Sequence, residues 1–132
     1  MWRCGRLVRA RLNVGVVHVS EAKMAKSAGN LVLVSDLLTD YPAGAVRLLI
    51  LDRRWDQDWE YDRARLDEAA ALLERLQAAA GRPDRAAAGA GTAVAAVRAA
   101  LASDLDVPAA LRIAEDDGGR AARVLGSFLG LW

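Results

Sequence analysis

Apolar and polar residues alternate over short distances in the first third of the chain. Residues 14–19 (VGVVHV) are rich in β-branched side chains, a composition typical of strands. Residues 30–34 (NLVLV) form a second short apolar run, and the polar, small-residue segment 20–29 separates the two. The pattern predicts two short strands joined by a loop.

Two short helices are expected next. Ser35 can cap a helix over residues 36–41, because its hydroxyl can accept a free backbone N–H of the first turn. Pro42 suits the first turn of a helix over residues 42–54, since its missing N–H is not needed there. Residues 55–61 (WDQDWEY) then separate these elements from a more regular helical region.

The longest helix is predicted over residues 63–80. Asp62 is a plausible N-cap, and Gly81 and Pro83 end the helix, as a C-terminal glycine and a following proline should. Apolar residues recur at the spacing of one buried helix face, at Leu66, Ala69, Ala70, Leu73 and Leu76.

The remainder of the chain predicts three more helices. They follow a flexible connection at 84–91 and cover residues 92–103, 108–117 and 120–131. The last of them is expected to offer Val124, Leu125, Phe128 and Leu129 to a core.

These elements predict a mostly α fold with two domains. Residues 1–61 would carry the short strands, the polar loop and the small helices, and residues 62–132 would form an antiparallel helical bundle. The chain is short enough for two such units to share one core.

Composition excludes several classes of protein. A formal net charge of +1 lacks the bulk basic character of nucleic-acid binders. No apolar run approaches the roughly 18 residues of a membrane helix, and the first residues lack the apolar core of a signal peptide. The single cysteine, Cys4, rules out an internal disulfide and a multi-cysteine zinc site. We expect a soluble cytoplasmic protein with no membrane partner.

The polar loop contains both lysines of the chain, Lys23 and Lys26, whereas every other basic residue is arginine. Lysine binds phosphate as a compact, mobile point charge, which suits a loop that closes on a polyphosphate and later releases it. Ser27 and the backbone around Gly29 could add donors. On residue types alone, two exposed lysines on a surface loop remain the alternative interpretation.

Two further groups of residues have both structural and functional interpretations. His18 lies in the first predicted strand, and we expect a packed or edge histidine rather than a site residue. Trp55, Trp59 and Tyr61 could stack against a nucleic-acid base, but we expect them to pack between the two halves of the chain.

The order of residues in the loop adds a resemblance. Residues 23–30 (KMAKSAGN) resemble the KMSKS signature of class I aminoacyl-tRNA synthetases. Residues 32–62 are similar to the short helix, "AIRL"-type helix and aromatic turn that follow it, and residues 104–111 (DLDVPAAL) to a motif of the next helical domain. The resemblance covers nearly the whole chain. It is specific to cysteinyl-tRNA synthetase and to the related ligase that joins cysteine to glucosaminyl-inositol in mycothiol synthesis.

The resemblance implies an ATP-dependent ligase and assigns roles to the matching residues. Lys26 would be the catalytic residue, which contacts the ATP phosphates and stabilises negative charge as pyrophosphate leaves. Lys23, Met24 and Ser27 would complete the ATP-binding loop, and Gly29–Asn30 would shape its exit. Arg47 matches an arginine of the "AIRL" helix, where we expect a structural role.

Departures from the family pattern cluster around this loop. Ala25 replaces the middle serine of the signature, and Ser20, Glu21 and Ala22 stand where the family usually has Asp-Gly-Glu, so a turn glycine is absent. Further departures lie at Arg11, Asn13, Arg53, Arg54 and Trp55.

The resemblance also implies parts that the sequence lacks. The family binds ATP and cysteine on an upstream Rossmann-like domain with a HIGH signature and zinc ligands, whereas His18 and Cys4 are each the only residue of their kind here. We therefore expect zinc only in that missing domain. We expect no cysteine activation by this chain alone, because it could not align the substrates.

Three interpretations follow. The chain could be the C-terminal part of a cysteine-activating ligase, with a catalytic half in trans and either tRNA or an amino-sugar inositol as acceptor. It could also be a non-catalytic helical interaction module, or a truncated remnant of such a ligase. The lysine pair favours the first, and the altered flanks favour the other two. An apolar surface over residues 14–19, 30–34 and 45–51 would promote docking or self-association.

Overall fold

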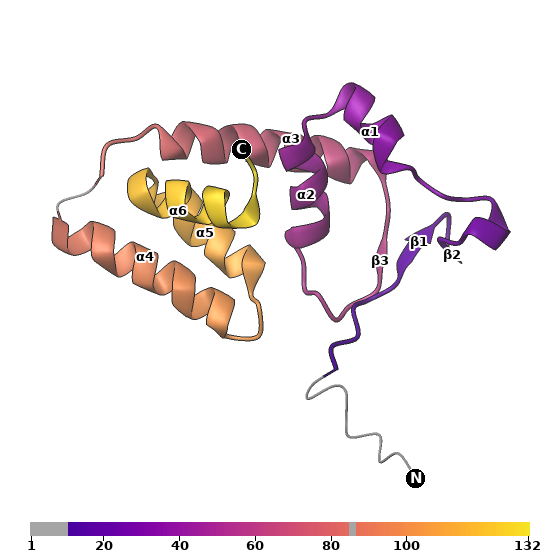
Figure 1. Cartoon of the computed structure of the whole chain (residues 1–132), viewed down its shortest axis with the longest axis horizontal. Coiled ribbons are helices and arrows are strands. Elements are labelled where there is room, and N and C mark those ends of the chain that lie inside the picture. The colour runs from indigo at the N-terminus through magenta and orange to yellow at the C-terminus, as the bar shows by residue number, and fades with distance from the viewer. Residues whose placement is uncertain (1–10, 85–86) are drawn as a thin grey trace, which may run out of the picture.

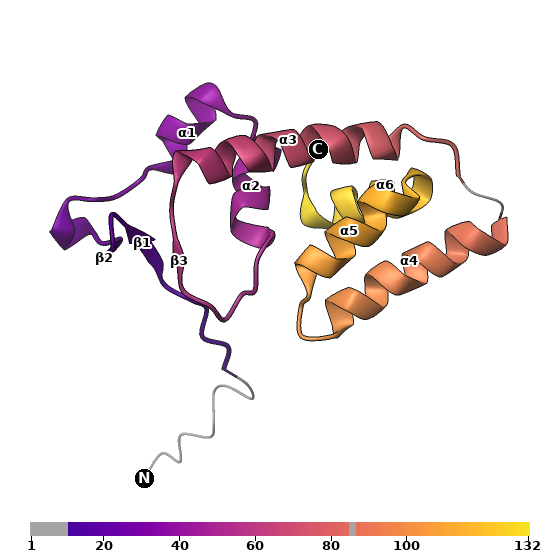
Figure 2. The same ribbon diagram turned by 180° about the vertical axis from the view of Figure 1, so that it is seen from behind.

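The computed structural model describes residues 11–84 and 87–132 of the chain, so Cys4 lies outside the described part. A long helix, α3 (Arg63–Ala80), runs along one side of the molecule (Figure 1). The remaining helices of the C-terminal half gather at one end of α3, and a small sheet lies at the other end (Figure 2). The expected mostly α fold with short strands is confirmed.

Helix α3 has the predicted bounds and the predicted cap. The Asp62 carboxylate accepts the backbone N–H of Ala64 at 3.0 Å, which satisfies one of the free donors of the first turn. Four of the five residues predicted on its inner face are buried, and Ala70 is half-buried.

The C-terminal helices are α4 (Ala87–Ala102), α5 (Val107–Asp117) and α6 (Gly119–Leu129). Helix α4 begins inside the segment predicted as a flexible connection, so that prediction was wrong from residue 87 onward. The prediction for Phe128 was also wrong, since this residue is 73% exposed. The buried stripe of α6 runs through Ala121, Leu125 and Leu129, and Phe128 lies at its edge.

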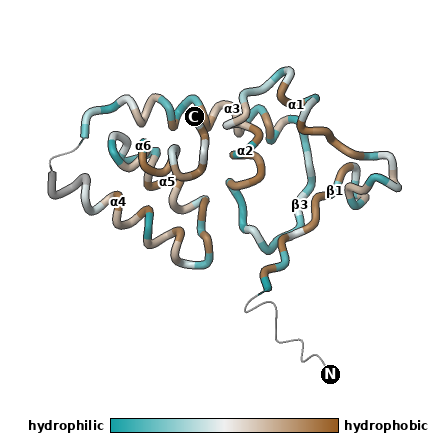
Figure 3. Tube along the Cα trace, viewed as in Figure 1, coloured by the Kyte–Doolittle hydropathy of each residue, from teal (hydrophilic) through white to brown (hydrophobic). Residues whose placement is uncertain are grey.

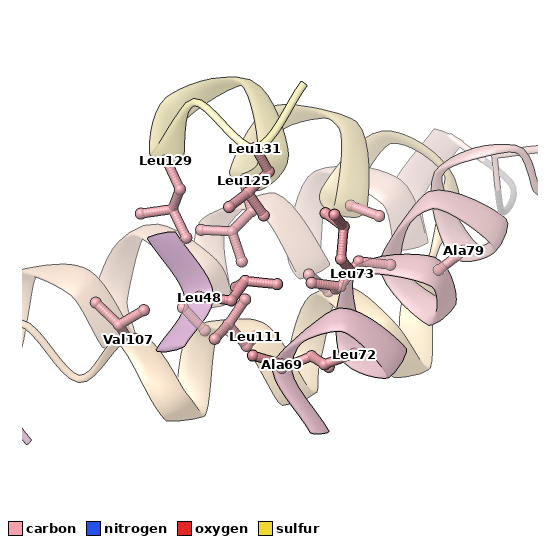
Figure 4. Close-up of a cluster of buried hydrophobic side chains, with 14 of the residues drawn as sticks. Leu48, Ala69, Leu72, Leu73, Ala79, Val107, Leu111, Leu125, Leu129 and Leu131 are labelled. Atoms are coloured by element: carbon pink, nitrogen blue, oxygen red, sulfur yellow. The ribbon is translucent and has the colours of Figure 1, made fainter. Parts of the chain in front are cut away.

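One hydrophobic core joins these helices (Figure 4). Leu48 of α2 (Ala43–Leu51) lies in it beside Leu73, Leu111 and Leu125, so α2 packs with the helical bundle. The domain boundary at residue 61 stays a prediction. The Arg47 guanidinium donates from Nε to the Leu129 carbonyl at 2.9 Å, which gives this residue the expected structural role.

The sheet has the order β2–β1–β3. Strand β1 (Val17–Val19) pairs antiparallel with β2 (Ala22–Lys23) and parallel with β3 (Trp59–Glu60). The strand predicted over residues 30–34 was wrong, because β3 occupies the second edge of β1. Residues 30–33 instead form an irregular segment that leads into α1 (Val34–Asp40).

The two small helices differ from prediction at their ends. Leu33, not Ser35, is the N-cap residue of α1, and the Ser35 hydroxyl donates to the Asp36 carboxylate inside the first turn. Helix α2 begins at Ala43, one residue later than predicted, with Pro42 as its N-cap residue, and it ends at Leu51, three residues early.

Candidate functional site

The lysine loop (residues 20–30) starts with a tight hairpin. Ser20 and Glu21 connect β1 to β2, and both have left-handed backbones, with φ of 53° and 64°. Two central residues with positive φ are the pattern of a type I′ turn, which favours Asn-Gly or Asp-Gly. The absent turn glycine noted in the sequence therefore falls at a position that favours glycine.

Asn30 closes the other end of the loop. Its Oδ1 accepts the backbone N–H of Ala25 at 2.9 Å, and its Nδ2 donates to the carbonyl of Lys23 at 3.2 Å. Between these contacts, residues Lys26–Ala28 form a 3₁₀ turn that ends at Gly29, whose φ is 67°. The expected role of Gly29–Asn30 in shaping the loop thus has a definite geometry: one amide side chain fixes two backbone groups.

Lys23, Lys26 and Ser27 all have exposed side chains. Within the described residues, neither lysine ammonium group forms a hydrogen bond or an ion pair, and neither does the Ser27 hydroxyl. The loop therefore combines a backbone fixed by Asn30 with donors that an anionic ligand could reach.

The sheet places the side chains of Lys23 and Met24 on opposite faces. His18 pairs in register with Lys23 on one side and with Glu60 on the other, so the three side chains share one face. Met24 follows on the opposite side and lines an apolar groove. His18 is half-buried in the central strand of the sheet, and its interpretation as a packed or edge histidine stays a prediction.

The residues that lead into strand β1 are held closely by the segment that precedes β3. The Gly15 N–H donates to the Trp55 carbonyl at 2.9 Å, and the Val16 N–H donates to the Asp58 carboxylate at 2.7 Å. A Cβ atom on Gly15 would lie 1.8 Å from the carbonyl oxygen of Gln57. Only glycine permits this close approach of the two backbones. The approach fixes the start of β1, and with it the lysine loop, relative to β3.

The three aromatic residues of this segment pack as expected between the two halves. The Trp55 indole Nε1–H donates to the carbonyl of Asp104, at the turn between α4 and α5, at 2.9 Å. Trp59 and Tyr61 are half-buried against the core. The Arg53 guanidinium lies 3.8 Å from the centre of the Trp59 ring, and burial lowers the pKa of this arginine.

An apolar groove of about 790 Å³ lies between the sheet and the helical bundle. Val17 and Met24 line it from the loop side, Ile50 from α2, and Leu105 and Phe128 from the bundle. Figure 3 shows apolar stretches of chain along β1, along α2 and in the segment that leads into α1. The predicted apolar surface is therefore present, and it extends onto the bundle, which the sequence did not indicate.

The described part of the chain lacks two other features. No helix there has the length and apolar character needed to cross a bilayer. The same residues contain no group of three or more potential metal-ligating His, Cys, Asp or Glu side chains.

Comparisons with known proteins bear on the same loop. Residues 3–71, more than half of the chain, match the family model of the class I (C) tRNA synthetase catalytic domain. The chain is also similar to L-cysteine:1D-myo-inositol 2-amino-2-deoxy-alpha-D-glucopyranoside ligases. The one from Thermobispora bispora is 43% identical over 105 residues, which cover 80% of this chain and 26% of the relative.

The enzyme from Acidothermus cellulolyticus is 44% identical over 115 residues, 84% of this chain and 27% of the relative. That from Beutenbergia cavernae is 40% identical over 124 residues, 90% of this chain and 28% of the relative. The chain thus spans about a quarter of the length of these curated relatives. The family-model match includes the whole lysine loop, and the chain belongs to the class I (C) tRNA synthetase family.

Proposed function

We propose that this chain supplies the ATP-phosphate loop of a cysteine-activating ligase and acts together with a catalytic part that carries the adenine and cysteine sites. One observation carries the proposal: Asn30 fixes the backbone of the loop while Lys23 and Lys26 stay exposed and without partners among the described residues. Less conformational freedom is lost when a preordered loop binds a polyphosphate.

Lys26 would stabilise the negative charge that develops as pyrophosphate leaves. A positioned cation acts most strongly where charge develops during the reaction and water is excluded. Lys23 would add a second positive charge from β2, and the Ser27 hydroxyl would donate a hydrogen bond to a phosphate oxygen. ATP would supply the leaving group, and these residues would bind and orient it.

Met24 would have a different role from its neighbours. Its backbone N–H donates to the carbonyl of Val17 at 2.8 Å, and its side chain lines the apolar groove. We propose that Met24 anchors the loop to this groove and so supports ATP binding indirectly. The groove would then connect the ATP-binding loop to whatever covers it.

The catalytic part would be supplied in trans and would cover the groove. Zinc would be bound within that catalytic part. One observation supports a partner at this surface: the groove is lined mostly by apolar residues. The similarity to ligases that are named for an amino-sugar inositol favours this acceptor over tRNA.

The test is a tagged pull-down of the chain from its source cells, followed by activity assays on the purified complex. We expect a stoichiometric partner with a HIGH signature and zinc ligands, and cysteine-dependent ATP–pyrophosphate exchange by the complex. Lys26→Ala should reduce that exchange by roughly 100-fold, the usual effect of removing one transition-state donor. Arg75→Ala is the matched control, because Arg75 is an exposed cation that pairs with Glu115 in the bundle.

Two outcomes would contradict the proposal. Exchange above background by the isolated chain would show that no catalytic part is needed. The lack of any such partner would favour a helical interaction module or a remnant instead. In the complex, the acceptor follows from adding tRNA or an amino-sugar inositol and measuring which one receives cysteine.

A further inference from the structure

The turn between α4 and α5 has an unusual backbone. Asp104 and Leu105 are both left-handed, with φ of 57° and 53°. Aspartate tolerates this conformation better than most residues, but leucine pays the full steric penalty between its Cβ and the backbone. Contacts must offset this cost, and besides the backbone hydrogen bonds of Asp106 some of them come from outside the turn.

Residues 54 and 55 supply those contacts. The Trp55 indole Nε1–H donates to the Asp104 carbonyl at 2.9 Å, and the Arg54 guanidinium donates to the Asp104 carboxylate at 2.7 Å. Arg54 also pairs with Asp56 at 3.0 Å, which holds its side chain in place. Two consecutive side chains thus bind one residue of the bundle.

On its other side, the same segment binds Gly15 and Val16, which lead into strand β1. The carbonyl of Trp55 accepts the Gly15 N–H, and the Val16 carbonyl accepts the Trp59 N–H, both at 2.9 Å. Strand β1 begins at Val17, directly after Val16, and the Val17 carbonyl accepts the N–H of Met24 in the lysine loop. A continuous series of hydrogen bonds therefore leads from the Asp104 turn to the loop.

The apolar groove lies between the helical bundle and the sheet. Packed side chains therefore do not fix the distance between the bundle and the sheet at this point. We propose that Arg54, Trp55 and Asp104 form a strut that sets the position of the lysine loop relative to the helical bundle. Trp55 is then a positioning residue, which would not touch ATP. The inference rests on the proposed function for what the loop binds, but the strut itself does not.

The two contacts of the strut differ in strength. The side chains of Arg54 and Asp104 are 49% and 56% exposed, and ion pairs in solvent contribute little. Trp55 combines a hydrogen bond with a half-buried ring that lines the groove. The indole contact should therefore carry most of the effect.

Amide hydrogen exchange of the full chain, followed by NMR, tests the strut. Trp55→Phe keeps an aromatic ring but removes the Nε1–H donor. We expect the amides of Gly15 and Met24 to exchange roughly fivefold faster, the factor expected when one typical hydrogen bond is lost. The amides of Leu73 and Leu125, in the core of α3 and α6, should keep their rates.

Arg75→Gln is the matched control. It breaks an ion pair of 2.6 Å between α3 and α5 within the bundle, and it should leave Gly15 and Met24 unchanged. If Trp55→Phe does not fold, Arg54→Gln provides the same comparison with a smaller expected increase, about twofold.

Two results would overturn the strut: unchanged exchange at Gly15 and Met24 in a folded variant, or an equal increase at Leu73 and Leu125. Failure of the proposed function is distinguishable. If amide hydrogen exchange rises at Gly15 and Met24 in Trp55→Phe while Lys26→Ala leaves ATP–pyrophosphate exchange by the complex unchanged, the strut stands. The proposed role of the loop in ATP binding is then wrong.

Discussion

At the residue scale, single polar side chains satisfy backbone groups that no regular element pairs. Asn30 does so within the lysine loop, and Arg47 does so at the C-terminal end of α6. The family resemblance indicated both positions from the sequence. Their partners could not be predicted, because Arg47 binds a carbonyl 82 residues away and nothing local encodes that contact.

Asn30→Ala should loosen the loop without unfolding the chain. It removes one part-buried and one exposed hydrogen bond, each worth about 1 kcal/mol. We expect faster amide exchange at Ala25, measured by NMR. Asn30→Asp is the control, because it keeps the oxygen that accepts the Ala25 N–H and should preserve most of the protection. Equal protection of the Ala25 amide in Asn30→Ala and in the wild type would show that the Asn30 side chain does not fix the loop.

The charge of Asp52 should lower stability at neutral pH. Burial of its carboxyl group is the main cause of a raised pKa, against the opposing effect of Arg53. The unfolded chain releases this proton near pH 3.8 and the folded chain at higher pH, so stability falls as pH rises between the two pKa values. Asp52→Asn should therefore be more stable than the wild type at pH 7 but not at about pH 3.

Urea unfolding at both pH values measures this difference. Asp56→Asn should behave in the opposite way, because the hydrogen bond from Arg54 lowers the pKa of Asp56. Ionised Asp56 contributes stability above its unfolded pKa, and that contribution is lost as pH falls through its lowered folded pKa. A lower stability of Asp52→Asn at pH 7 would show that burial does not dominate at this site.

At the element scale, the accuracy of each prediction depends on where its signals lie. The cap, apolar spacing and end of α3 are all local, so its bounds could be predicted from residues 62–83. The apolar run at 30–34 has the composition of a strand, but backbone pairing with another strand decides whether a strand forms. The partner of β1 is β3, about 40 residues later, and composition alone cannot specify it.

Glu21→Gly should stabilise the β1–β2 hairpin. Glycine adopts the left-handed backbone without the steric cost that glutamate pays, and the backbone N–H of residue 21 keeps its contact with the Glu60 carboxylate. We expect a gain of about 1 kcal/mol, reduced by the entropy of glycine in the unfolded chain. Chemical denaturation measures it.

Glu21→Ala is the control for the lost charge, because alanine keeps the steric cost and should give no gain. Equal stability of the two variants would mean that the turn is not strained at this residue.

At the scale of the whole molecule, one core joins α2 to the bundle, while an open groove separates the bundle from the sheet. The helical content followed from sequence periodicity. The groove did not, because it depends on how α2, α6 and the sheet are placed around one another. Phe128 illustrates this: its spacing fits a core position, but the packing of α6 leaves it at the groove.

The isolated chain should self-associate through the groove. Ile50 is 54% exposed and Phe128 is 73% exposed, and both line it. Ile50→Ser and Phe128→Ser should each shift the chain toward monomer in sedimentation velocity experiments. Leu38→Ser is the control, because Leu38 is 47% exposed on α1 but does not line the groove. A monodisperse wild-type monomer at high concentration would contradict this expectation.

The central claim is that the lysine loop acts on ATP phosphates in a cysteine-activating ligase. It is tested most directly in a chimera, in which this chain replaces the matching segment of the Thermobispora bispora ligase. The measurement is cysteine-dependent ATP–pyrophosphate exchange. We predict that the chimera is active and that Lys26→Ala lowers its exchange by roughly 100-fold. A folded, active chimera whose exchange does not depend on Lys26 would contradict the account.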